Sequence, residues 1–269
     1  NLRKLAGRSH RFTNLRQVQG ASATITGIIA SQCGFPVKVG THLAVNSTIS
    51  AIDRPYENET CLADTLSENN YQTVFMGGAP LSFAGKGKFL ETHGYEQVYG
   101  ERELTPLLSD TNYRHGWGLY DDSLFDMARE KLLELEGSDQ PYLLTLLTLD
   151  THHPKGYLSG SCKRHKELND QMAQAIYCSD QLISSFILDA MNTVDMEDTV
   201  IVLFSDHISM RNSFWNVLRE NQKKRRLSFM IFDDSSGGTS KVRGHHFDIA
   251  PTVLEAAGLP GTLKVGAGS

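Results

Sequence analysis

A strand-like run that ends in an acid and a histidine places the strongest constraint on how this chain can fold. Residues 199–207 read TVIVLFSDH, and their five consecutive apolar residues predict a central strand buried on both faces of a parallel sheet. Open α/β sheets bind ligands at the carboxyl ends of their strands, which is where Asp206 and His207 fall. A carboxylate beside an imidazole offers two ligands to one divalent metal, whereas the competing interpretation is a polar turn after a core strand.

A second predicted strand also runs into histidines. Residues 142–149 (YLLTLLTL) form an apolar run, and DTHHP follows at 150–154. The proline prevents the chain from continuing as a helix, so His152 and His153 are expected on the same sheet edge as Asp206. A solvated histidine turn is the alternative interpretation.

Small residues followed by an apolar stretch mark a tight strand-to-helix turn near the N-terminus. Residues 19–31 read QGASATITGIIAS, and GFP at 34–36 ends the predicted helix. The free backbone N–H groups of a first helical turn favour an oxyanion or a phosphoryl group. Ser22, Thr24 and Thr26 are candidates for a hydroxyl at that place, and helix capping is the ordinary role of each.

Strand-like and helix-like segments alternate along all 269 residues, which predicts an α/β protein with a mostly parallel central sheet and helices on both faces. Further segments are expected as strands at 72–76 and 227–232, a long helix at 172–191 and a surface loop at 37–59. No linker divides the chain, so we expect one domain at 1–269. The sequence starts at Asn1 and enters the fold at once, so we expect the first strand and any membrane segments upstream.

Composition bears on the partners of the chain. The net charge of −5 gives no reason to expect nucleic-acid binding. The one dense basic cluster, KKRR at 223–226, is either a solvated helix end or a contact with anionic lipid. No apolar stretch reaches 18 residues, so no segment is predicted to span a membrane.

The four cysteines are Cys33, Cys61, Cys162 and Cys178. None lies in a C-x-x-C pair, which argues against a zinc knuckle. Their even number suits two disulfides in an oxidising compartment, and four buried thiols are the alternative. Three connectivities are possible, of which Cys33–Cys61 with Cys162–Cys178 closes short loops.

Several segments, taken together, resemble a known family. SDH at 205–207 and DIAPTVL at 248–254 are typical of the alkaline phosphatase/sulfatase superfamily. Within it, the chain resembles the lipoteichoic acid synthase and phosphoglycerol transferase branch through RQVQG at 16–20, ASQCG at 30–34, FAGK at 83–86, DTHHP at 150–154 and SDH. The resemblance covers nearly the whole chain and implies a single sulfatase-like catalytic domain.

The resemblance implies roles for individual residues. Thr24 corresponds to the family's nucleophile, and Asp206 and His207 correspond to metal ligands that share their ion with the Thr24 hydroxyl. His152 corresponds to a substrate-contacting histidine with a catalytic role. Lys86, otherwise an ordinary surface lysine, corresponds to a cationic residue (arginine in the synthases) that holds the substrate's phosphate.

Further expectations follow for the rest of the site. His153 and Trp117 are expected to contact the substrate. The family's fourth metal ligand, a Glu on the first central strand, is expected upstream of this chain. The synthases have another histidine where this chain has Met76 or Gly77, and His246 is a possible substitute. The oxygen ligands suit Mn²⁺ or Mg²⁺, and Zn²⁺ is possible.

The implied activity is metal-dependent phosphoglycerol transfer in the bacterial cell envelope, outside the cytoplasm. Thr24 would take phosphoglycerol from a phosphatidylglycerol-type lipid, forming a covalent intermediate, and a periplasmic glucan or related glycan would accept it. An N-terminal segment would anchor the protein to the inner membrane. The alternatives are a sulfatase or a phosphoethanolamine transferase of the same fold, or a non-catalytic derivative that binds glycan or lipid. A sulfatase normally carries a C/S-x-P-x-R motif, which is absent around Thr24.

Overall fold

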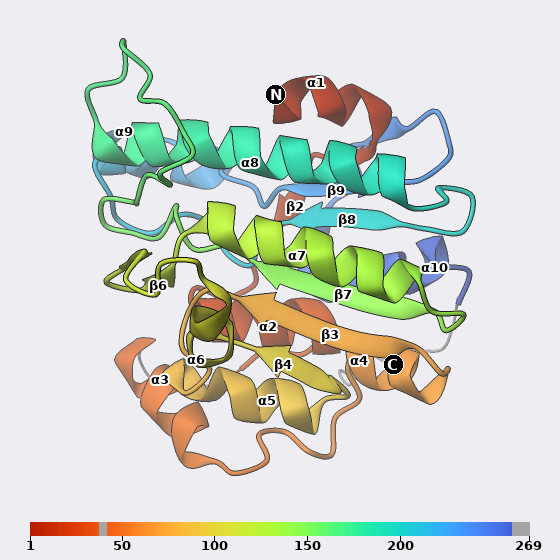
Figure 1. Cartoon of the computed structure of the whole chain (residues 1–269). Helices are drawn as coiled ribbons and strands as arrows, with labels where there is room; N and C mark the ends of the chain where they lie inside the picture. The colour runs from red at the N-terminus through yellow and green to blue at the C-terminus, as the bar shows by residue number, and fades with distance from the viewer. Residues whose placement is uncertain (38–41, 260–269) are drawn as a thin grey trace.

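The computed structural model describes residues 1–37 and 42–259, in which two main sheets lie between layers of helices (Figure 1). The first sheet has the order β4-β3-β7 and is parallel, and the second has the order β10-β1-β9-β8, with β9 antiparallel to both of its neighbours. The strands are β1 (His10–Phe12), β2 (Leu15–Arg16), β3 (Gln72–Gly77), β4 (Gln97–Tyr99), β5 (Arg114–His115), β6 (Gly118–Leu119), β7 (Tyr142–Leu147), β8 (Ile201–Phe204), β9 (Phe229–Phe232), β10 (Gly238–Ser240) and β11 (Gly244–His245). The α-helices are α1 (Leu2–Leu5), α2 (Thr24–Cys33), α3 (His42–Ala51), α4 (Leu62–Glu68), α5 (Lys86–Thr92), α6 (Glu101–Leu104), α7 (Asp121–Glu136), α8 (Gln171–Thr193), α9 (Trp215–Glu220) and α10 (Ile249–Ala256).

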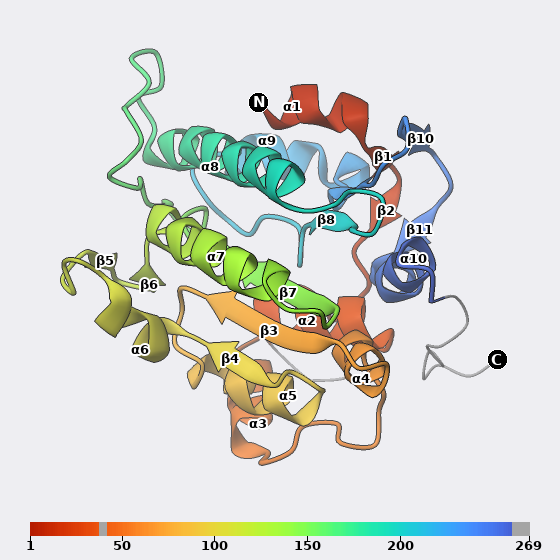
Figure 2. The same cartoon turned by 45° about the vertical axis from the view of Figure 1, so that its right-hand side comes forward.

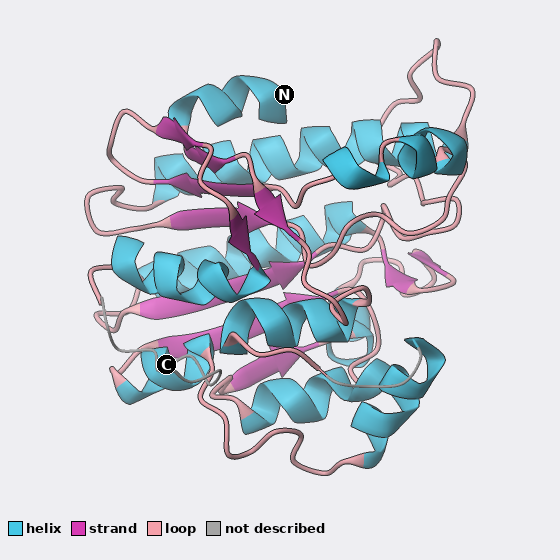
Figure 3. Ribbon diagram, turned by 180° about the vertical axis from the view of Figure 1, so that it is seen from behind, coloured by secondary structure: helices cyan, strands magenta, loops and turns pink. Residues whose placement is uncertain are grey.

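Helices cover both faces of the sheets, which confirms the predicted α/β class (Figures 1 and 3). Helices α7 and α8 lie on one face, whereas α2 and α10 lie on the other (Figure 2). The side chains of β7 alternate accordingly: Leu144 and Leu146 pack in the core cluster under α7, and Leu143 and Leu147 pack toward α2 and α4. This period-2 alternation explains why an apolar run without polar interruptions forms a strand here.

Strand β8 is less buried than its sequence predicts. All four of its residues are half-buried, as are all six of β7, whereas β3 is buried at every position after Gln72. The difference arises because β3 pairs on both edges, while β7 and β8 each pair on one edge only within the described part of the chain. Neighbouring strands, and not only the helices above and below, are needed to bury a strand completely.

The stretch expected as a surface loop at 37–59 contains a helix, α3. The prediction was wrong for this part, and residues 38–41 of the stretch lie outside the described residues. Packing explains the helix: Ile49 is fully buried in the cluster that includes Phe89 of α5. Gly85, at φ +68°, brings its backbone against the Ile49 carbonyl, where any Cβ would lie 2.8 Å from the oxygen. Tertiary contact therefore overrides the turn-forming Asn, Ser and Thr residues of α3.

Both disulfides follow the short-loop connectivity. Cys33 at the end of α2 bonds to Cys61, which precedes α4, and both are fully buried. Cys162 bonds to Cys178 of α8 and so ties the loop after β7 to that helix. Among the described residues, no helix has both the length and the apolar character that a membrane crossing requires.

Candidate active site

The turn after β8 presents Asp206 and His207 with ligand atoms that face each other. Asp206 Oδ1 accepts the N–H of His207 at 2.8 Å, and Asp206 Oδ2 lies 3.5 Å from His207 Nε2. His207 Nδ1 lies 2.9 Å from the Ile208 carbonyl, which can only accept a hydrogen bond, so Nδ1 carries the proton and Nε2 keeps its lone pair. A carboxylate oxygen beside an imidazole lone pair of fixed orientation fits one divalent cation.

The first turn of α2 packs directly against this turn. Thr24 is the first residue of the helix, and Gly27, three residues later, lies so close to Asp206 that a Cβ would meet its carbonyl oxygen at 2.1 Å. Only glycine allows this approach, and residues three apart share a helix face, so Thr24 lies on the face of α2 that packs on Asp206. Thr24 is half-buried, and its hydroxyl has no hydrogen-bond partner among the described residues.

Thr26, the neighbouring hydroxyl, has a capping role instead. Its Oγ1 accepts the N–H of Ala23 at 3.2 Å and donates to the Ala23 carbonyl at 2.9 Å. Thr26 is 1% exposed. Of these two hydroxyls of the strand-to-helix turn, the Thr24 hydroxyl is therefore the one available for chemistry.

His246, considered as an additional ligand, is engaged elsewhere. Its Nε2 lies 2.7 Å from the Asp206 carbonyl, and its Nδ1 accepts the N–H of Val18 at 3.2 Å. A ring that donates from one nitrogen and accepts at the other has no lone pair left for a metal. His246 is fully buried, and burial lowers its pKa below 6.5. It fixes the backbone of Asp206.

The histidines after β7 lie next to the Asp206–His207 pair. His152 Nδ1 lies 2.7 Å from the His153 carbonyl, which leaves Nε2 with a lone pair, and the His152 ring lies 4.2 Å from the Trp117 ring. Burial lowers the pKa of His152, and the charges of His153 and His207 lower it further, opposed by the hydrogen bond to the His153 carbonyl and by Asp206. Burial likewise lowers the pKa of His153. The structure therefore brings His152, His153 and Trp117 together with Asp206 and His207.

Lys86, at the start of α5, is a buried cation. It follows Gly85, is 4% exposed, and has no hydrogen-bond or ion-pair partner among the described residues. Desolvation by burial lowers its pKa to about 8. No contact joins it to Thr24 or Asp206 in the described part of the chain. A buried ammonium without a counter-ion is costly, and it suits a site that takes an anion.

We expect Lys86→Met to raise the free energy of unfolding at pH 7 by on the order of 1–3 kcal/mol, because methionine fills the same space without the desolvation cost of a charge. Since folding lowers the pKa of Lys86, this cost is fully present below about pH 8 and fades as the pH rises toward 10.5. Urea unfolding at pH 7 and near pH 10.5 measures both effects. Lys88→Met is the matched control, because Lys88 is exposed and pairs with Asp53. An equal gain at both pH values would contradict the expectation.

A buried polar network supports the end of β7, and sequence reasoning missed it. Both carboxylate oxygens of Asp121 accept backbone N–H groups, from Leu149 at 2.6 Å and Asp150 at 3.1 Å. Burial and the neighbouring Asp150 charge together raise the pKa of Asp121 to about 8, against the two backbone hydrogen bonds, which lower it. Asp121 is the first residue of α7, but its partners lie 28 and 29 residues away. An acid at a predicted helix start gives no sequence signal for such long-range contacts.

His115 connects this network to Trp117. Its Nε2 faces Asp150 Oδ1 at 3.5 Å, its ring stacks on Tyr157 at 3.9 Å, and its Nδ1 accepts the Trp117 N–H at 3.2 Å. The His115 Nε2 and the Asp150 Oδ1 are buried and have no closer partner in the described residues. His115 therefore holds the hairpin that places Trp117 on His152.

We expect His115→Leu to loosen Trp117 and to lower any turnover that depends on His152 by about tenfold, because misplaced binding groups raise the barrier. A red shift of Trp117 fluorescence, measured with Trp215→Phe so that one indole remains, reports the loosening directly. His165→Leu is the control, since that ring packs on Tyr177. Unchanged Trp117 emission would contradict the positioning role.

A second cluster of potential ligands does not fit a metal. Ligand atoms of Cys61, Asp64 and His93 lie within 4.8 Å of one another. The Cys61 sulfur is bonded to Cys33, so no thiolate is available. Asp64 Oδ2 accepts the Cys61 N–H, and the two His93 nitrogens contact Asp64 and the Pro55 carbonyl. These contacts therefore have a structural role beside α4.

Comparisons with known proteins identify relatives of this chain. The chain is 37% identical over 263 residues to phosphoglycerol transferase I of Escherichia coli (strain 55989 / EAEC), covering 96% of this chain and 34% of that protein. The chain thus spans about a third of the length of this relative.

Solved structures share the fold. A protein in the alkaline phosphatase superfamily from Vibrio parahaemolyticus matches with a TM-score of 0.77 at 22% identity, over 96% of this chain and 60% of that one. The lipoteichoic acid synthase LtaP from Listeria monocytogenes matches with a TM-score of 0.74 at 18% identity, over 100% and 68%. These structures confirm the predicted alkaline phosphatase/sulfatase-like fold. The sulfatase family model matches residues 1–259, and the chain therefore belongs to the sulfatase family.

Proposed function

We propose that this protein is a metal-dependent phosphoglycerol transferase. It moves phosphoglycerol from a phosphatidylglycerol-type lipid, through a covalent intermediate on Thr24, to a periplasmic glucan or related glycan. The observation that carries the proposal is the close packing of α2 on Asp206 through Gly27. It supports a Thr24 hydroxyl that has no partner among the described residues and shares a helix face with Gly27, near a carboxylate and an imidazole lone pair. The similarity to phosphoglycerol transferase I over 96% of the chain supports the choice of transferred group.

Asp206, His207 and the Thr24 hydroxyl would hold the metal. The donor set of oxygens with one nitrogen suits Mn²⁺ or Mg²⁺, with Zn²⁺ as the remaining candidate. A divalent ion bound there lowers the pKa of a coordinated hydroxyl and offsets negative charge on phosphoryl oxygens. The orientation of His207 comes from its Nδ1–H, which donates to the Ile208 carbonyl at 2.9 Å.

The chain's own residues account for the group transfer. Thr24 Oγ1 attacks the phosphorus and loses its proton to solvent, a P–O bond to Thr24 forms, and the P–O bond to diacylglycerol breaks. His152 Nε2, after its lone pair has taken up a proton from solvent, gives that proton to the departing oxygen. In the second step, a glycan hydroxyl attacks the phosphorus, its proton passes to His152 Nε2, and Thr24 leaves and regains a proton. Lys86 offsets charge on the phosphate, and His153 and Trp117 hold the glycerol end.

The proposed setting is the extracytoplasmic side of the bacterial inner membrane, with an N-terminal anchor. Two disulfides in the structure suit an oxidising compartment. The donor lipid is a membrane component, so an enzyme that uses it must work at a membrane surface.

A sulfatase is the second candidate, favoured by the family match over residues 1–259. The two candidates differ in the group that reaches Thr24. We would incubate the purified protein with Mn²⁺ and phosphatidylglycerol, phosphatidylethanolamine or an aryl sulfate, and follow the intact mass and diacylglycerol release. The proposal expects a phosphoglycerol adduct with phosphatidylglycerol alone. Sulfate release without any lipid turnover would replace it with the sulfatase.

A further inference from the structure

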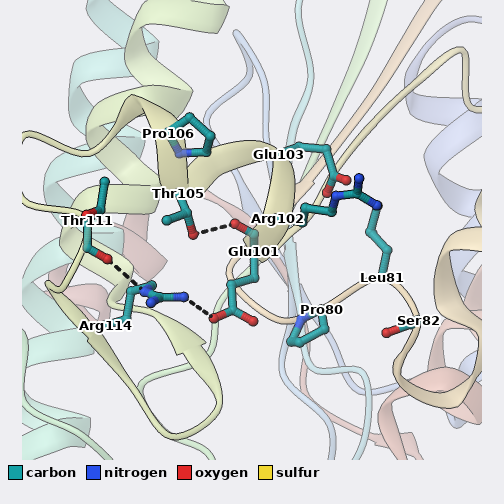
Figure 4. Close-up of a pocket in the computed structure, with 10 residues that line it drawn as sticks. All are labelled: Pro80, Leu81, Ser82, Glu101, Arg102, Glu103, Thr105, Pro106, Thr111 and Arg114. Carbon is teal, nitrogen blue, oxygen red and sulfur yellow. Dashed lines mark hydrogen bonds and ion pairs between the residues drawn. The ribbon is translucent and has the colours of Figure 1, made fainter.

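A pocket of about 700 Å³ has no role in the scheme above (Figure 4). Its walls come from the loop after β3, from α6 with the turn that follows it, and from the segment that leads into β5. This volume is within the range of small-molecule sites.

The pocket lies at the sheet edge that carries the histidines. Strands β4 and β7 both run parallel to β3, so the pocket residues that follow β3 and β4 share an edge with His152, which follows β7. Strand β4 is two positions from β7, a distance of about 10 Å across the sheet. An oligosaccharide of a few units spans that distance.

A chain of aromatic contacts leads from the pocket to His152. Ser82 lines the pocket, and the next residue, Phe83, packs edge-to-face on Trp117 with ring centroids 5.7 Å apart. Trp117 in turn lies 4.2 Å from His152. Phe83 is 47% exposed, so this aromatic surface is open to a ligand. The flat faces of aromatic rings suit the apolar C–H faces of sugars.

The hairpin that carries Arg114 and Trp117 is firmly seated. Leu119 N–H donates to the Gly78 carbonyl at 3.0 Å, and a Cβ at Gly118, where φ is +138°, would lie 2.0 Å from the same oxygen. Only glycine permits this contact, so the hairpin forms a preformed wall. Preformed walls reduce the entropy cost of binding.

The polar groups of the pocket balance in charge. Arg114 pairs with Glu101 at 2.9 Å, and Arg102 and Glu103 add one charge of each sign (Figure 4). Hydroxyls of Ser82 and of two threonines also line the pocket, together with apolar Pro80, Leu81 and Pro106. Guanidinium groups donate and carboxylates accept, which matches sugar hydroxyls that do both. An anionic ligand would face the two carboxylates, and an apolar one would leave charges unpaired.

We propose that this pocket binds the glycan acceptor as a neutral oligosaccharide and directs one hydroxyl across Trp117 toward His152. The inference rests on the proposed phosphoglycerol transfer, whose second step it supplies: the hydroxyl oxygen attacks phosphorus, the bond to Thr24 breaks, and the hydroxyl proton passes to His152 Nε2.

The test fills the pocket by Thr111→Trp and compares it with Leu107→Trp. Thr111 lines the pocket and is exposed, and its backbone carbonyl keeps its bond to Arg114. Leu107 is 65% exposed, lies on the segment after α6 and does not line the pocket. Three quantities are measured: diacylglycerol release, transfer to a neutral linear gluco-oligosaccharide, and saturation-transfer NMR contacts of that oligosaccharide without lipid.

We expect Thr111→Trp to raise the half-saturating oligosaccharide concentration at least about tenfold. It should also erase the NMR contacts while diacylglycerol release is unchanged, and Leu107→Trp should behave as the parent. Unchanged contacts and saturation in Thr111→Trp would overturn the inference, as would tighter binding of a sulfated oligosaccharide. Absence of diacylglycerol release from the parent protein would instead reject the proposed function, and the NMR contacts would still decide the pocket.

Discussion

Thr24→Val should abolish the covalent adduct and reduce diacylglycerol release from phosphatidylglycerol by at least about a thousandfold, since removing a nucleophile leaves only the weaker help of binding and charge stabilisation. Valine keeps the branched shape of threonine at the start of α2 but has no hydroxyl. The helix and its packing on Asp206 are therefore expected to remain, and circular dichroism and the unfolding midpoint verify that. Intact mass spectrometry after incubation with lipid measures the adduct.

Thr24→Ser is the complementary variant, because it keeps the hydroxyl and loses the methyl group. We expect it to form the adduct at a reduced rate. Thr26→Ser controls for changes in the same turn, since it retains the hydroxyl that caps Ala23. An adduct on Thr24→Val would show that another group is the nucleophile, and peptide mapping would locate it.

The strand ends of the site could be predicted because they depend on local pattern. β3, β7 and β9 lie within or close to the predicted ranges, and α8 covers the predicted long helix. The rule that α/β sheets bind ligands at the carboxyl ends of strands then predicted that His152 would approach Asp206. His152 and Asp206 come close together because of the order of strands and helices along the chain, and the sequence pattern already indicates that order. Their catalytic roles stay predictions.

Contacts between distant segments could not be predicted in the same way. Nothing near His115 in the sequence indicates that Asp150 lies 3.5 Å away, or that Asp121 accepts hydrogen bonds from the end of β7. His246 was considered as a substitute for a histidine of the synthases, and only the positions of Val18 and the Asp206 carbonyl show that both of its nitrogens are engaged. Each of these facts requires the relative placement of elements that are far apart in the chain.

The half-buried state of β8 has the same origin. Five apolar residues predict a strand, but the number of its neighbours depends on how the sheets assemble. The α3 helix is a further case, because its packing under Gly85 outweighs a sequence that favours turns. Local pattern therefore predicted strands and helices well where the burial of their own apolar residues determines the structure. It failed at α3, and for the degree of burial of β8, because contacts with distant segments determine both.

Asp206→Asn should weaken Mn²⁺ binding by at least about a hundredfold. Mutating a residue that merely hydrogen-bonds to a metal ligand lowers metal affinity about ten- to a hundredfold, and this substitution removes the charge of a ligand itself. The amide keeps the size of the side chain, and its oxygen can still accept the His207 N–H that Oδ1 accepts at 2.8 Å. Calorimetric titration with Mn²⁺ in the absence of lipid measures the affinity without turnover.

Asp64→Asn is the matched control, since Asp64 belongs to the other cluster of potential ligands, beside the Cys33–Cys61 disulfide. We expect it to leave Mn²⁺ affinity unchanged and to lower stability, because Asp64 Oδ2 accepts the Cys61 N–H at 2.9 Å and contacts His93. The reverse pattern, with affinity lost in Asp64→Asn and kept in Asp206→Asn, would move the metal to the disulfide side of the molecule. It would also remove the metal from Thr24, because Thr24 shares a helix face with Gly27, which packs on Asp206.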